Sequence, residues 1–270
     1  MYWCDPMSLE PVYEIPLASG KGMTDRISID RAKQLDLLPR VTGIIADVLG
    51  AGWALQQYHQ KNAAFAAEHL AREEGECDDD YFERVSTLAG REARKRRDRG
   101  TQVHLAVSRY LFDGEASEDP CAFELCKTLS DLMERVDARD ITSEHTLGDR
   151  SFGYVGTPDI YIGDCDLWAL ANEMQERPYP MPEGRGEAVL DLKTTDLAKY
   201  RKPYREHLYQ FGGYANLCKL GSDALFVQWY ADPWTARSLF VCHQDTERWK
   251  EAFNCLYRAW LIETGFDLPL

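Results

Sequence analysis

The chain has 270 residues, a formal net charge of −14 at pH 7, 44% hydrophobic residues and 28% charged residues. These values are typical of a soluble globular protein with one elaborated domain or two small ones, and the negative charge argues against nucleic-acid binding over the whole surface. No apolar run approaches the roughly 20 residues of a membrane helix, and the N-terminus lacks the basic and apolar segments of a secretory signal, so we expect a cytoplasmic protein with no membrane partner.

Residues 1–39 are predicted to form an extended N-terminal arm, because they show little hydrophobic periodicity and contain several prolines. Proline has no backbone N–H and interrupts helices and central strands. A short hairpin is compatible with the pattern, and the arm could pack on the core or on a partner. The prolines are Pro6, Pro11, Pro16 and Pro39.

Residues 40–138 are predicted to be helical. Thr42 can cap a helix that ends before Gly50 and Gly52, and a longer apolar-faced helix follows. The acidic stretch 75–80 lacks the alternating ligands and central glycine of a calcium loop, so we expect a solvated loop there. The expected helices are 43–49, 53–72, 81–112 and 121–136.

Residues 139–270 are predicted to form the sheet core. Asp159 stands at the head of an alternating strand that we expect to close in a turn at Gly163 and Asp164. The stretch between Asp164 and Glu187 is rich in Pro, Gly and charge, and we expect a surface excursion. The other expected elements are a strand from 141, strands 188–193, 225–230 and 238–242, and helices 198–220 and 245–264.

Charged residues stand within these apolar strands. Successive side chains of a strand point to opposite faces, so Asp191 and Lys193 share one face and Leu192 lies on the other. Charge at such positions is costly unless it is paired or bound to a metal. An ordinary salt bridge between Asp191 and Lys193 is the alternative explanation.

Three further residues could join this group. His104 shares a helix face with Val107, and a lone helix histidine is most often structural. Glu144 lies in the first expected strand, where a role in a site and a plain exposed acid are equally supported. Gln210 and Tyr214 are four residues apart on the expected helix and therefore share a face.

Two basic stretches interrupt the acidic chain. Residues 91–99 hold six basic and two acidic residues, a net +4, and residues 193–206 hold five basic and two acidic residues, a net +3. Such runs are usually solvated helix faces. Beside a site that acts on a polyanion such as DNA, contact with phosphate would be the better interpretation. The residues that would then bind DNA are Arg96, Arg97, Arg99, Lys199, Arg201, Lys202 and Arg205.

The ordered motifs resemble a known group of enzymes. Pro158-Asp159 followed by Asp191-Leu192-Lys193 resembles the signature of the PD-(D/E)xK nuclease superfamily. Gln210 to Tyr214 resembles the Q-x-x-x-Y motif of its RecB-like branch, and Gly100 to His104 resembles the G-x-x-x-H element of that branch. The motifs occur in the family's order and span roughly residues 41–230.

The resemblance implies a single α/β domain over residues 40–270, with a restriction-endonuclease-like core: a mixed central sheet flanked by helices, and a helical N-terminal part over the site. It also implies a metal-dependent DNA exonuclease that acts on free ends in phage or bacterial recombination, repair or DNA processing, with a homo-oligomer or a recombination protein as a possible partner. A catalytically silent DNA-binding or assembly subunit with this fold, or a small-molecule phosphohydrolase, are the alternatives.

In this reading Mg²⁺ or Mn²⁺ is held by oxygen and nitrogen donors. Lys193 stabilises the charge that develops on the phosphate. The expected metal ligands are His104, Asp159, Asp191 and the backbone carbonyl of Leu192, and the expected catalytic residues are Lys193, Asp191, Asp159, Glu144, Gln210 and Tyr214.

The eight cysteines are expected to act as small apolar residues. They form no C-x-x-C pair, and disulfides are unusual in the cytoplasm. Some RecB-like relatives hold an iron–sulfur cluster with one upstream cysteine and three closely spaced C-terminal cysteines. Here Cys218, Cys242 and Cys255 are too far apart for that spacing, so we expect no cluster.

Overall fold

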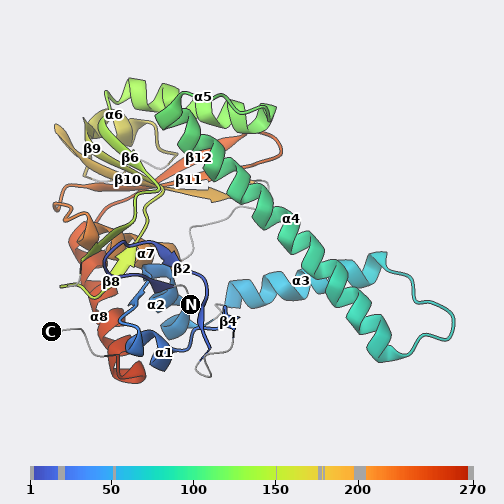
Figure 1. Cartoon of the computed structure of the whole chain (residues 1–270). Coiled ribbons are helices and arrows are strands. Elements are labelled where there is room, and N and C mark those ends of the chain that lie inside the picture. Colours follow the sequence, from blue (N-terminus) through green and yellow to red (C-terminus); the bar gives the residue numbers. More distant parts are fainter. Residues whose placement is uncertain are drawn as a thin grey trace.

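The computed structural model describes residues 3–17, 22–50, 53–149, 151–175, 178, 180–197 and 205–266. Its centre is a five-stranded mixed sheet in the order β12-β11-β10-β9-β6 (Figure 1). β10 and β11 are parallel, and the other neighbouring pairs are antiparallel. The strands are β6 (Arg139–Ser143), β9 (Ile160–Asp166), β10 (Arg185–Thr194), β11 (Leu225–Ala231) and β12 (Ser238–His243).

Helices cover both faces of the sheet, which explains why β10 and β11 read as nearly continuous apolar runs. One face carries Leu190 and Leu192 and packs against α4, α5 and α6, while the other carries Val189 and Phe226 and packs against α2, α7 and α8 (Figure 1). α7 (Arg205–Leu217) lies between the parallel strands β10 and β11 in the chain. The prediction of a mixed sheet flanked by helices is confirmed. The other helices are α1 (Ile29–Gln34), α2 (Val41–Leu49), α3 (Trp53–His69), α4 (Asp78–Asp113), α5 (Pro120–Arg135), α6 (Leu167–Asn172) and α8 (Thr246–Thr264).

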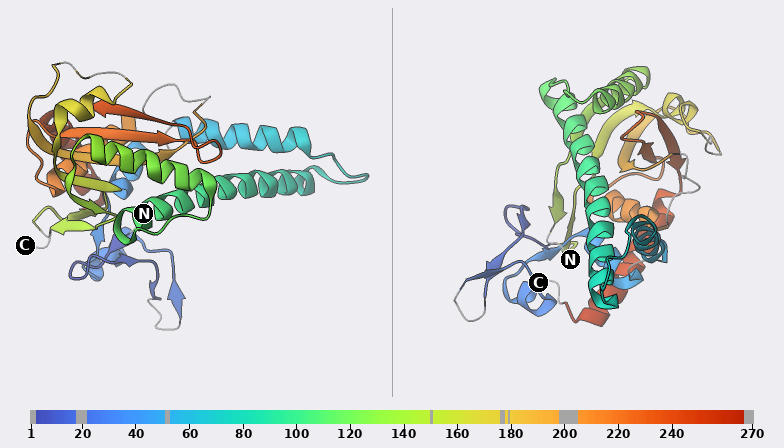
Figure 2. Two further views of the ribbon diagram at one scale, coloured as in Figure 1. Left: turned by 90° about the horizontal axis from the view of Figure 1, so that it is seen from above. Right: turned by 90° about the vertical axis from the view of Figure 1, so that its right-hand side faces the viewer.

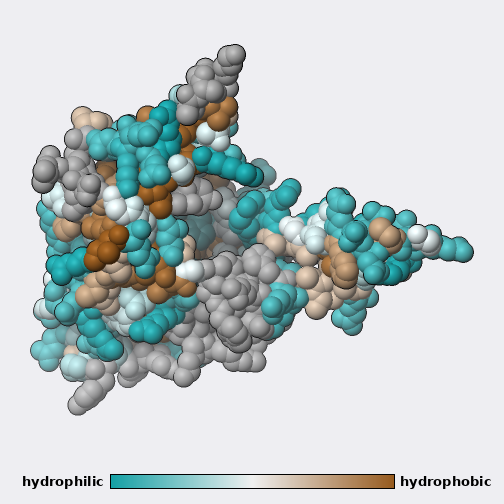
Figure 3. Space-filling view, turned by 90° about the horizontal axis from the view of Figure 1, so that it is seen from below, coloured by the Kyte–Doolittle hydropathy of each residue, from teal (hydrophilic) through white to brown (hydrophobic). Residues whose placement is uncertain are grey.

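α3 and the first half of α4 lie side by side and project from the body as a helical arm (Figures 1 and 2). Seen from below, its surface mixes hydrophilic and apolar side chains (Figure 3), and Phe65 and Phe82 are among the exposed apolar ones.

The prediction of an acidic loop over residues 75–80 is partly wrong. Residues 78–80 form the first turn of α4, where negative charge is favourable because the helix dipole is positive at that end.

The first 39 residues are more structured than the expected extended arm. β1 (Trp3–Cys4), β2 (Pro11–Val12) and β5 (Leu38–Pro39) form a small sheet, β3 (Ile15–Pro16) and β4 (Met23–Thr24) form a hairpin, and α1 follows.

This N-terminal segment packs on the core. Trp3 is fully buried, and its ring lies against that of Phe266 with 5.7 Å between centroids. Lys33 Nζ donates a hydrogen bond of 2.8 Å to the carbonyl of Thr264. Of the two partners that the sequence left open for the segment, the structure selects the core.

Two local predictions are wrong. Helix α2 begins at Val41 with Arg40 at its N-cap, two residues before the expected cap at Thr42. β9 continues through Gly163 to Asp166 and leads directly into α6, because Asp166 accepts a hydrogen bond from the N–H of Ala169 and caps that helix. The expected surface excursion therefore contains the end of a strand, a short helix and the beginning of β10. Two further bounded elements, β7 (Leu147–Asp149) and β8 (Tyr154–Gly156), form a separate hairpin.

No helix among the described residues combines the length and the apolar character needed to cross a membrane.

Candidate active site

Strand register brings three carboxylates to one position at the edge of the sheet core. Ile160 pairs with Leu190 on one side and with Ser143 on the other. Asp159 therefore lies beside Asp191 in β10 and beside Glu144, which directly follows β6. The backbone N–H of Glu144 donates a 3.1 Å hydrogen bond to the carbonyl of Asp159 and fixes this register. Glu144 lies in a turn with φ of 50° rather than in the expected strand.

Gly100 allows α4 to approach this position. A Cβ built on Gly100 would lie 2.7 Å from Oγ1 of Thr194 in β10, so a larger residue would separate helix and strand. His104 follows one helical turn later, on the same side. Val103 and Val107 are buried in the core and fix the rotation of the helix about its axis. The spacing of Gly100 and His104 thus has a direct structural cause.

His104, Glu144 and Asp159 form a compact donor group. His104 Nδ1 lies 3.4 Å from Asp159 Oδ1 and 3.6 Å from Glu144 Oε1. One ligand atom from each of the three residues lies within 4.8 Å of the other two. Burial alone would lower the pKa of His104, but hydrogen bonding and charge attraction to the two carboxylates raise it to about 10. Without a bound cation, the histidine thus supplies the positive charge that this acidic group requires.

The carboxylate of Asp159 is held from two sides. Its Oδ2 accepts a 2.6 Å hydrogen bond from the backbone N–H of Leu192. Burial would raise the pKa of Asp159, but His104, Lys193 and this N–H together hold the pKa below its usual range. Leu192 therefore contributes its N–H to the site, whereas the sequence-based expectation concerned its carbonyl.

Asp191 is 1% exposed and occupies a different environment from Asp159. Its Oδ1 accepts a 2.9 Å hydrogen bond from Lys193 Nζ, and its buried Oδ2 has no hydrogen-bond partner among the described residues. Burial raises the pKa of Asp191 to about 6, and the negative charge of Asp159 adds to the effect, while Lys193 opposes it. The pKa of Lys193 is nevertheless raised, because the attraction of the two aspartates exceeds the cost of burial.

Helix α7 continues this network. Lys193 Nζ lies 3.5 Å from Gln210 Oε1, and Gln210 Nε2 donates a 2.7 Å hydrogen bond to the hydroxyl of Tyr214. Gly156 admits the tyrosine, because a Cβ there would lie 2.8 Å from its ring. The predicted sharing of one helix face by Gln210 and Tyr214 is confirmed, and both residues reach the lysine side of the site.

The arrangement differs from the expected ligand set at Glu144 and Asp191, as well as at Leu192. The compact donor group contains Glu144, for which the sequence left two interpretations open, while Asp191 forms an ion pair with Lys193. The donors nonetheless fit a hard divalent cation, because they supply carboxylate oxygens and one imidazole nitrogen, and because Asp191 Oδ2 is buried without a partner among the described residues.

The basic residues divide into different environments. Arg96 and Arg97 are exposed on α4 and remain candidates for contact with a phosphate. Arg205 is exposed at the start of α7, with its guanidinium 5.7 Å from the ring centroid of Tyr209. The expected contacts at 199, 201 and 202 lie outside the described residues.

Arg99 has a structural role, and its contact with DNA stays a prediction that its internal partners disfavour. Its guanidinium forms a two-pronged ion pair with Asp119, with a 2.9 Å hydrogen bond from Nη2 to Oδ1, and it also donates to the carbonyl of Pro233. The side chain is only 12% exposed. No local sequence pattern indicates this role, because both partners are distant in the chain.

Arg40 is a residue beside the site that the sequence analysis missed. Its Nη2 donates a 2.9 Å hydrogen bond to Oγ1 of Thr157, which precedes the Pro158-Asp159 pair. Arg40 also forms an isolated parallel bridge with Val155. No local pattern marks this arginine, because the contact depends on how the N-terminal segment packs on β8.

The cysteines are all free, and Cys4, Cys126 and Cys165 are buried as small apolar side chains. Burial raises the pKa of the Cys126 thiol to about 11 and that of Cys165 to about 12, so both remain protonated and unreactive at neutral pH.

Comparison with known protein families and with curated proteins found no match. Among solved structures, the chain is similar to one described as the crystal structure of SSO0001, with 14% sequence identity and a TM-score of 0.31 over 78% of this chain and 87% of that one. This degree of likeness carries no argument about fold or function.

Proposed function

We propose that this protein is a metal-dependent nuclease that hydrolyses phosphodiester bonds in DNA, with a restriction-endonuclease-like core of the RecB-like type. One observation carries the proposal. Residues from four separate parts of the chain, which the sequence motifs single out independently, converge on one small volume: His104 on α4, Asp159 before β9, Asp191 and Lys193 in β10, and Gln210 on α7.

His104, Glu144 and Asp159 would hold the divalent cation, and Asp191 would face it with its unpartnered Oδ2. Such a cation would lower the pKa of a water molecule bound to it. Its positive charge would also stabilise the negative charge on the phosphate oxygens. An alternative without metal would leave a buried carboxylate oxygen unsatisfied, which is costly.

Lys193 would stabilise the negative charge that develops on the phosphate. Its raised pKa keeps the ammonium charged at neutral pH, and Asp191 Oδ1 and Gln210 Oε1 fix its position. Tyr214 in turn orients Gln210 through the hydrogen bond to its amide. The two α7 residues therefore act on the lysine as positioning residues.

The proposed substrate is DNA with a free end, and the proposed setting is the cytoplasm of a bacterium or an infected host cell, in recombination, repair or DNA processing. The exposed arginines of α4 support a polymeric anion rather than a small phosphate ester, because they extend the positive charge well beyond the catalytic group. A ring or other oligomer, or a recombination protein, would be compatible partners.

The test is digestion of end-labelled linear DNA and of covalently closed circular DNA with Mg²⁺, Mn²⁺ or Ca²⁺. We expect Mg²⁺ or Mn²⁺ to support stepwise shortening of the linear DNA and to leave the circles intact. Lys193→Ala should remove cleavage, with circular dichroism at the assay temperature showing that the variant is folded. Lys127→Ala, an exposed lysine on α5, is the matched control and should cleave normally. Absence of cleavage with every metal would contradict the proposal, as would full activity of Lys193→Ala.

A further inference from the structure

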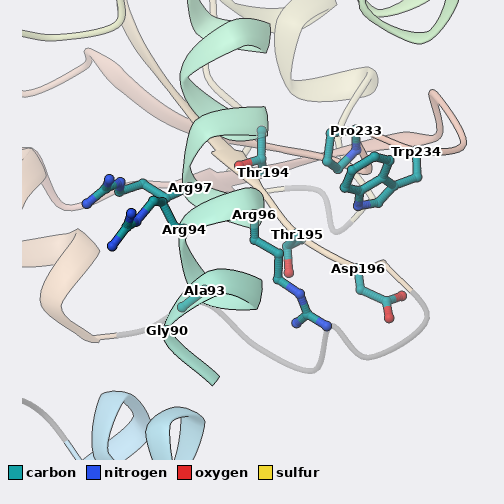
Figure 4. A pocket seen from close by; sticks show the side chains of 10 residues that line it. All are labelled: Gly90, Ala93, Arg94, Arg96, Arg97, Thr194, Thr195, Asp196, Pro233 and Trp234. Atoms are coloured by element: carbon teal, nitrogen blue, oxygen red, sulfur yellow. The ribbon is translucent and has the colours of Figure 1, made fainter. Parts of the chain in front are cut away.

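A cavity of about 820 Å³ lies next to the candidate active site, between α4 and the ends of β10 and β11. It begins at Thr194 and Thr195, the residues that directly follow Lys193 in the chain. Its remaining walls include Arg94, Arg96 and Arg97 of α4 and the indole of Trp234 (Figure 4). A ligand in this cavity would therefore extend from the catalytic lysine along a positively charged helix.

Trp234 is held rigidly although its side chain is 52% exposed. Its backbone N–H donates a 2.9 Å hydrogen bond to Asp232 Oδ1, and its carbonyl accepts one of 3.2 Å from the thiol of Cys121. The carbonyl of the preceding Pro233 accepts hydrogen bonds of 2.7 and 3.1 Å from Arg99. A large exposed aromatic ring on such a fixed backbone loses little entropy when a ligand stacks on it.

Two cations lie near this ring. Lys95 Nζ and the Arg99 guanidinium are 5.8 and 5.3 Å from the ring centroid. Both cations line a second cavity, of about 490 Å³, which shares Trp234 and Arg94 with the first. Neither of the two cations lines the first cavity. Trp234 therefore belongs to the lining of both cavities.

The arginines are arranged around the same helix. In Figure 4, Arg96 extends on the side of α4 on which Trp234 and Asp196 lie, and Arg94 and Arg97 extend on the opposite side. Among the described residues that line the first cavity, Asp196 is the one acidic residue. Three exposed arginines against one carboxylate leave the cavity positive in a chain whose net charge is −14. Such a concentration of positive charge favours an anionic ligand at this place over the rest of the surface.

We infer that the 820 Å³ cavity binds the unpaired end of a single-stranded nucleic acid, with one nucleobase stacked on Trp234, a nearby phosphate held by Arg96, and more distant phosphates held by Arg94 and Arg97 on the other side of α4. An exposed aromatic ring beside a cationic groove is the combination that proteins use for single strands, because every base offers a stacking face and the backbone offers charge. In a duplex those faces are covered by neighbouring bases. The choice of a nucleic acid as ligand rests on the proposed function; the preference for an unpaired strand rests on Trp234.

The experiment measures the binding of fluorescent oligonucleotides by anisotropy in Ca²⁺, so that it does not depend on cleavage. The ligands are a thymidine single strand, a single strand of the same length without bases, and a blunt duplex. The variants are Trp234→Ala, Trp234→Phe and, as the control, Trp168→Ala, a comparably exposed tryptophan (56%) on α6 that does not line the cavity. Unlabelled thymidine monophosphate serves as a competitor.

We expect Trp234→Ala to weaken binding of the thymidine strand by about 5- to 150-fold, the range that loss of one stacked base implies. Binding of the base-free strand and of the blunt duplex should change by less than about twofold, Trp234→Phe should recover much of the loss, and Trp168→Ala should resemble the wild type. Millimolar thymidine monophosphate should compete weakly, because the arginines contact several phosphates of a strand.

An equal loss on the base-free strand, or no loss on the thymidine strand, would overturn the inference, and full displacement by the mononucleotide would show a nucleotide site in place of a strand site. The nuclease proposal stands or falls separately. Wild-type cleavage with unchanged binding by Trp234→Ala refutes only the inference, and base-dependent binding without cleavage in any metal refutes only the nuclease proposal.

Discussion

The two halves of helix α4 differ although they belong to one continuous element of 36 residues. The first half projects with α3 as an arm (Figure 2), and only Val85 among its described side chains is buried in the manner of a core residue. The second half packs on the sheet through Gly100, Val103 and Val107. Both halves therefore have the sequence preference for a helix. Tertiary packing decides whether a given turn projects as part of the arm or packs on the sheet.

The boundary between the halves falls inside the basic stretch. Arg96 and Arg97 are exposed, whereas Arg99 is bound to Asp119 and to the carbonyl of Pro233. Three arginines within four residues thus include two candidates for contact with a ligand and one that fixes the turn carrying Trp234. A run of like charges is therefore no evidence that its members act alike. The contrast between the halves yields five tests, ordered from the largest expected effect to the smallest.

A substitution of His104 tests the role of the second half of α4. We expect His104→Ala to lower metal-dependent cleavage by at least about 100-fold, because even partners outside the ligand shell commonly cost 10- to 100-fold. Leu105→Ala changes the neighbouring, half-exposed side chain of the same helix and should leave the rate within about twofold. Cleavage rates at saturating DNA and a titration of metal make the comparison. A normal metal affinity in His104→Ala would remove the histidine from the ligand set.

A substitution of Asp119 tests the ion pair with Arg99 near the boundary between the two halves of α4. It pairs with Arg99 and also caps α5, since its Oδ1 accepts a 2.9 Å hydrogen bond from the N–H of Ala122. Asp119→Ala removes the cap and leaves a nearly buried guanidinium without its anion, so we expect a loss of about 2–3 kcal/mol in the free energy of unfolding. Asp131→Ala, an exposed aspartate on α5, should cost less than about 0.5 kcal/mol. Urea denaturation gives both values.

A pair of glycines on α4 compares the halves by the same substitution. Gly100→Ala places a methyl group against Thr194 and should destabilise the protein by about 1–2 kcal/mol, with lower activity because His104 moves with the helix. Gly90→Ala meets nothing within 4 Å and should stabilise the arm by up to about 1 kcal/mol, because alanine is the better helix former. A similar response at both positions would contradict the close approach of α4 to β10.

The salt dependence of DNA binding distinguishes the arginines that contact phosphate from those that do not. The double variant Arg96→Ala/Arg97→Ala should flatten the slope of log affinity against log salt by about 1.4 units on a single strand, or about 1.8 on a duplex, if each residue contacts one phosphate. Arg99→Ala, judged by the same slope, should leave it nearly unchanged because its donors are already bound. A slope change for Arg99→Ala as large as for Arg96→Ala would restore the interpretation that the sequence suggested.

The smallest expected effect is on the free energy of unfolding at acidic pH. The guanidinium of Arg99 lowers the pKa of Asp119 to about 2 from an ordinary value of 3.8. This carboxylate therefore contributes stability that is fully present above pH 4 and is lost as the pH falls through about 2. Since a third of the side chain is exposed, solvent screening limits the contribution to on the order of 1 kcal/mol. The difference in unfolding free energy between wild type and Asp119→Asn should shrink between pH 5 and pH 2.5.

The sequence predicts correctly which side chains share a face where a single strand or helix determines it. The alternation in β10 predicted that Asp191 and Lys193 share a face opposite Leu192, and the structure confirms it, because a strand has a fixed period of two. The spacing of Gln210 and Tyr214 predicted a shared helix face for the same kind of reason.

The sequence was a poor guide where contacts between distant segments decide. Glu144 joins the donor group because the register of β6 on β9 places it there, and neither of its local interpretations could be chosen beforehand. Arg99 and Trp234 are linked through the turn after β11, more than 130 residues from the arginine. The local pattern of the N-terminal segment predicts an extended arm, because a residue that packs on it, Phe266, lies more than 260 positions away in the chain.

The contact between Trp3 and Phe266 also limits the order of events in folding. During synthesis the first residues emerge long before the partners that bury them, so Trp3 and the small β1–β2–β5 sheet stay without their apolar cover until the end of α8 is available. Closing a contact across nearly the whole chain carries an entropic cost that local helices do not meet. We therefore expect α4, α5 and the sheet to form first, and the N-terminal segment to dock last over α8.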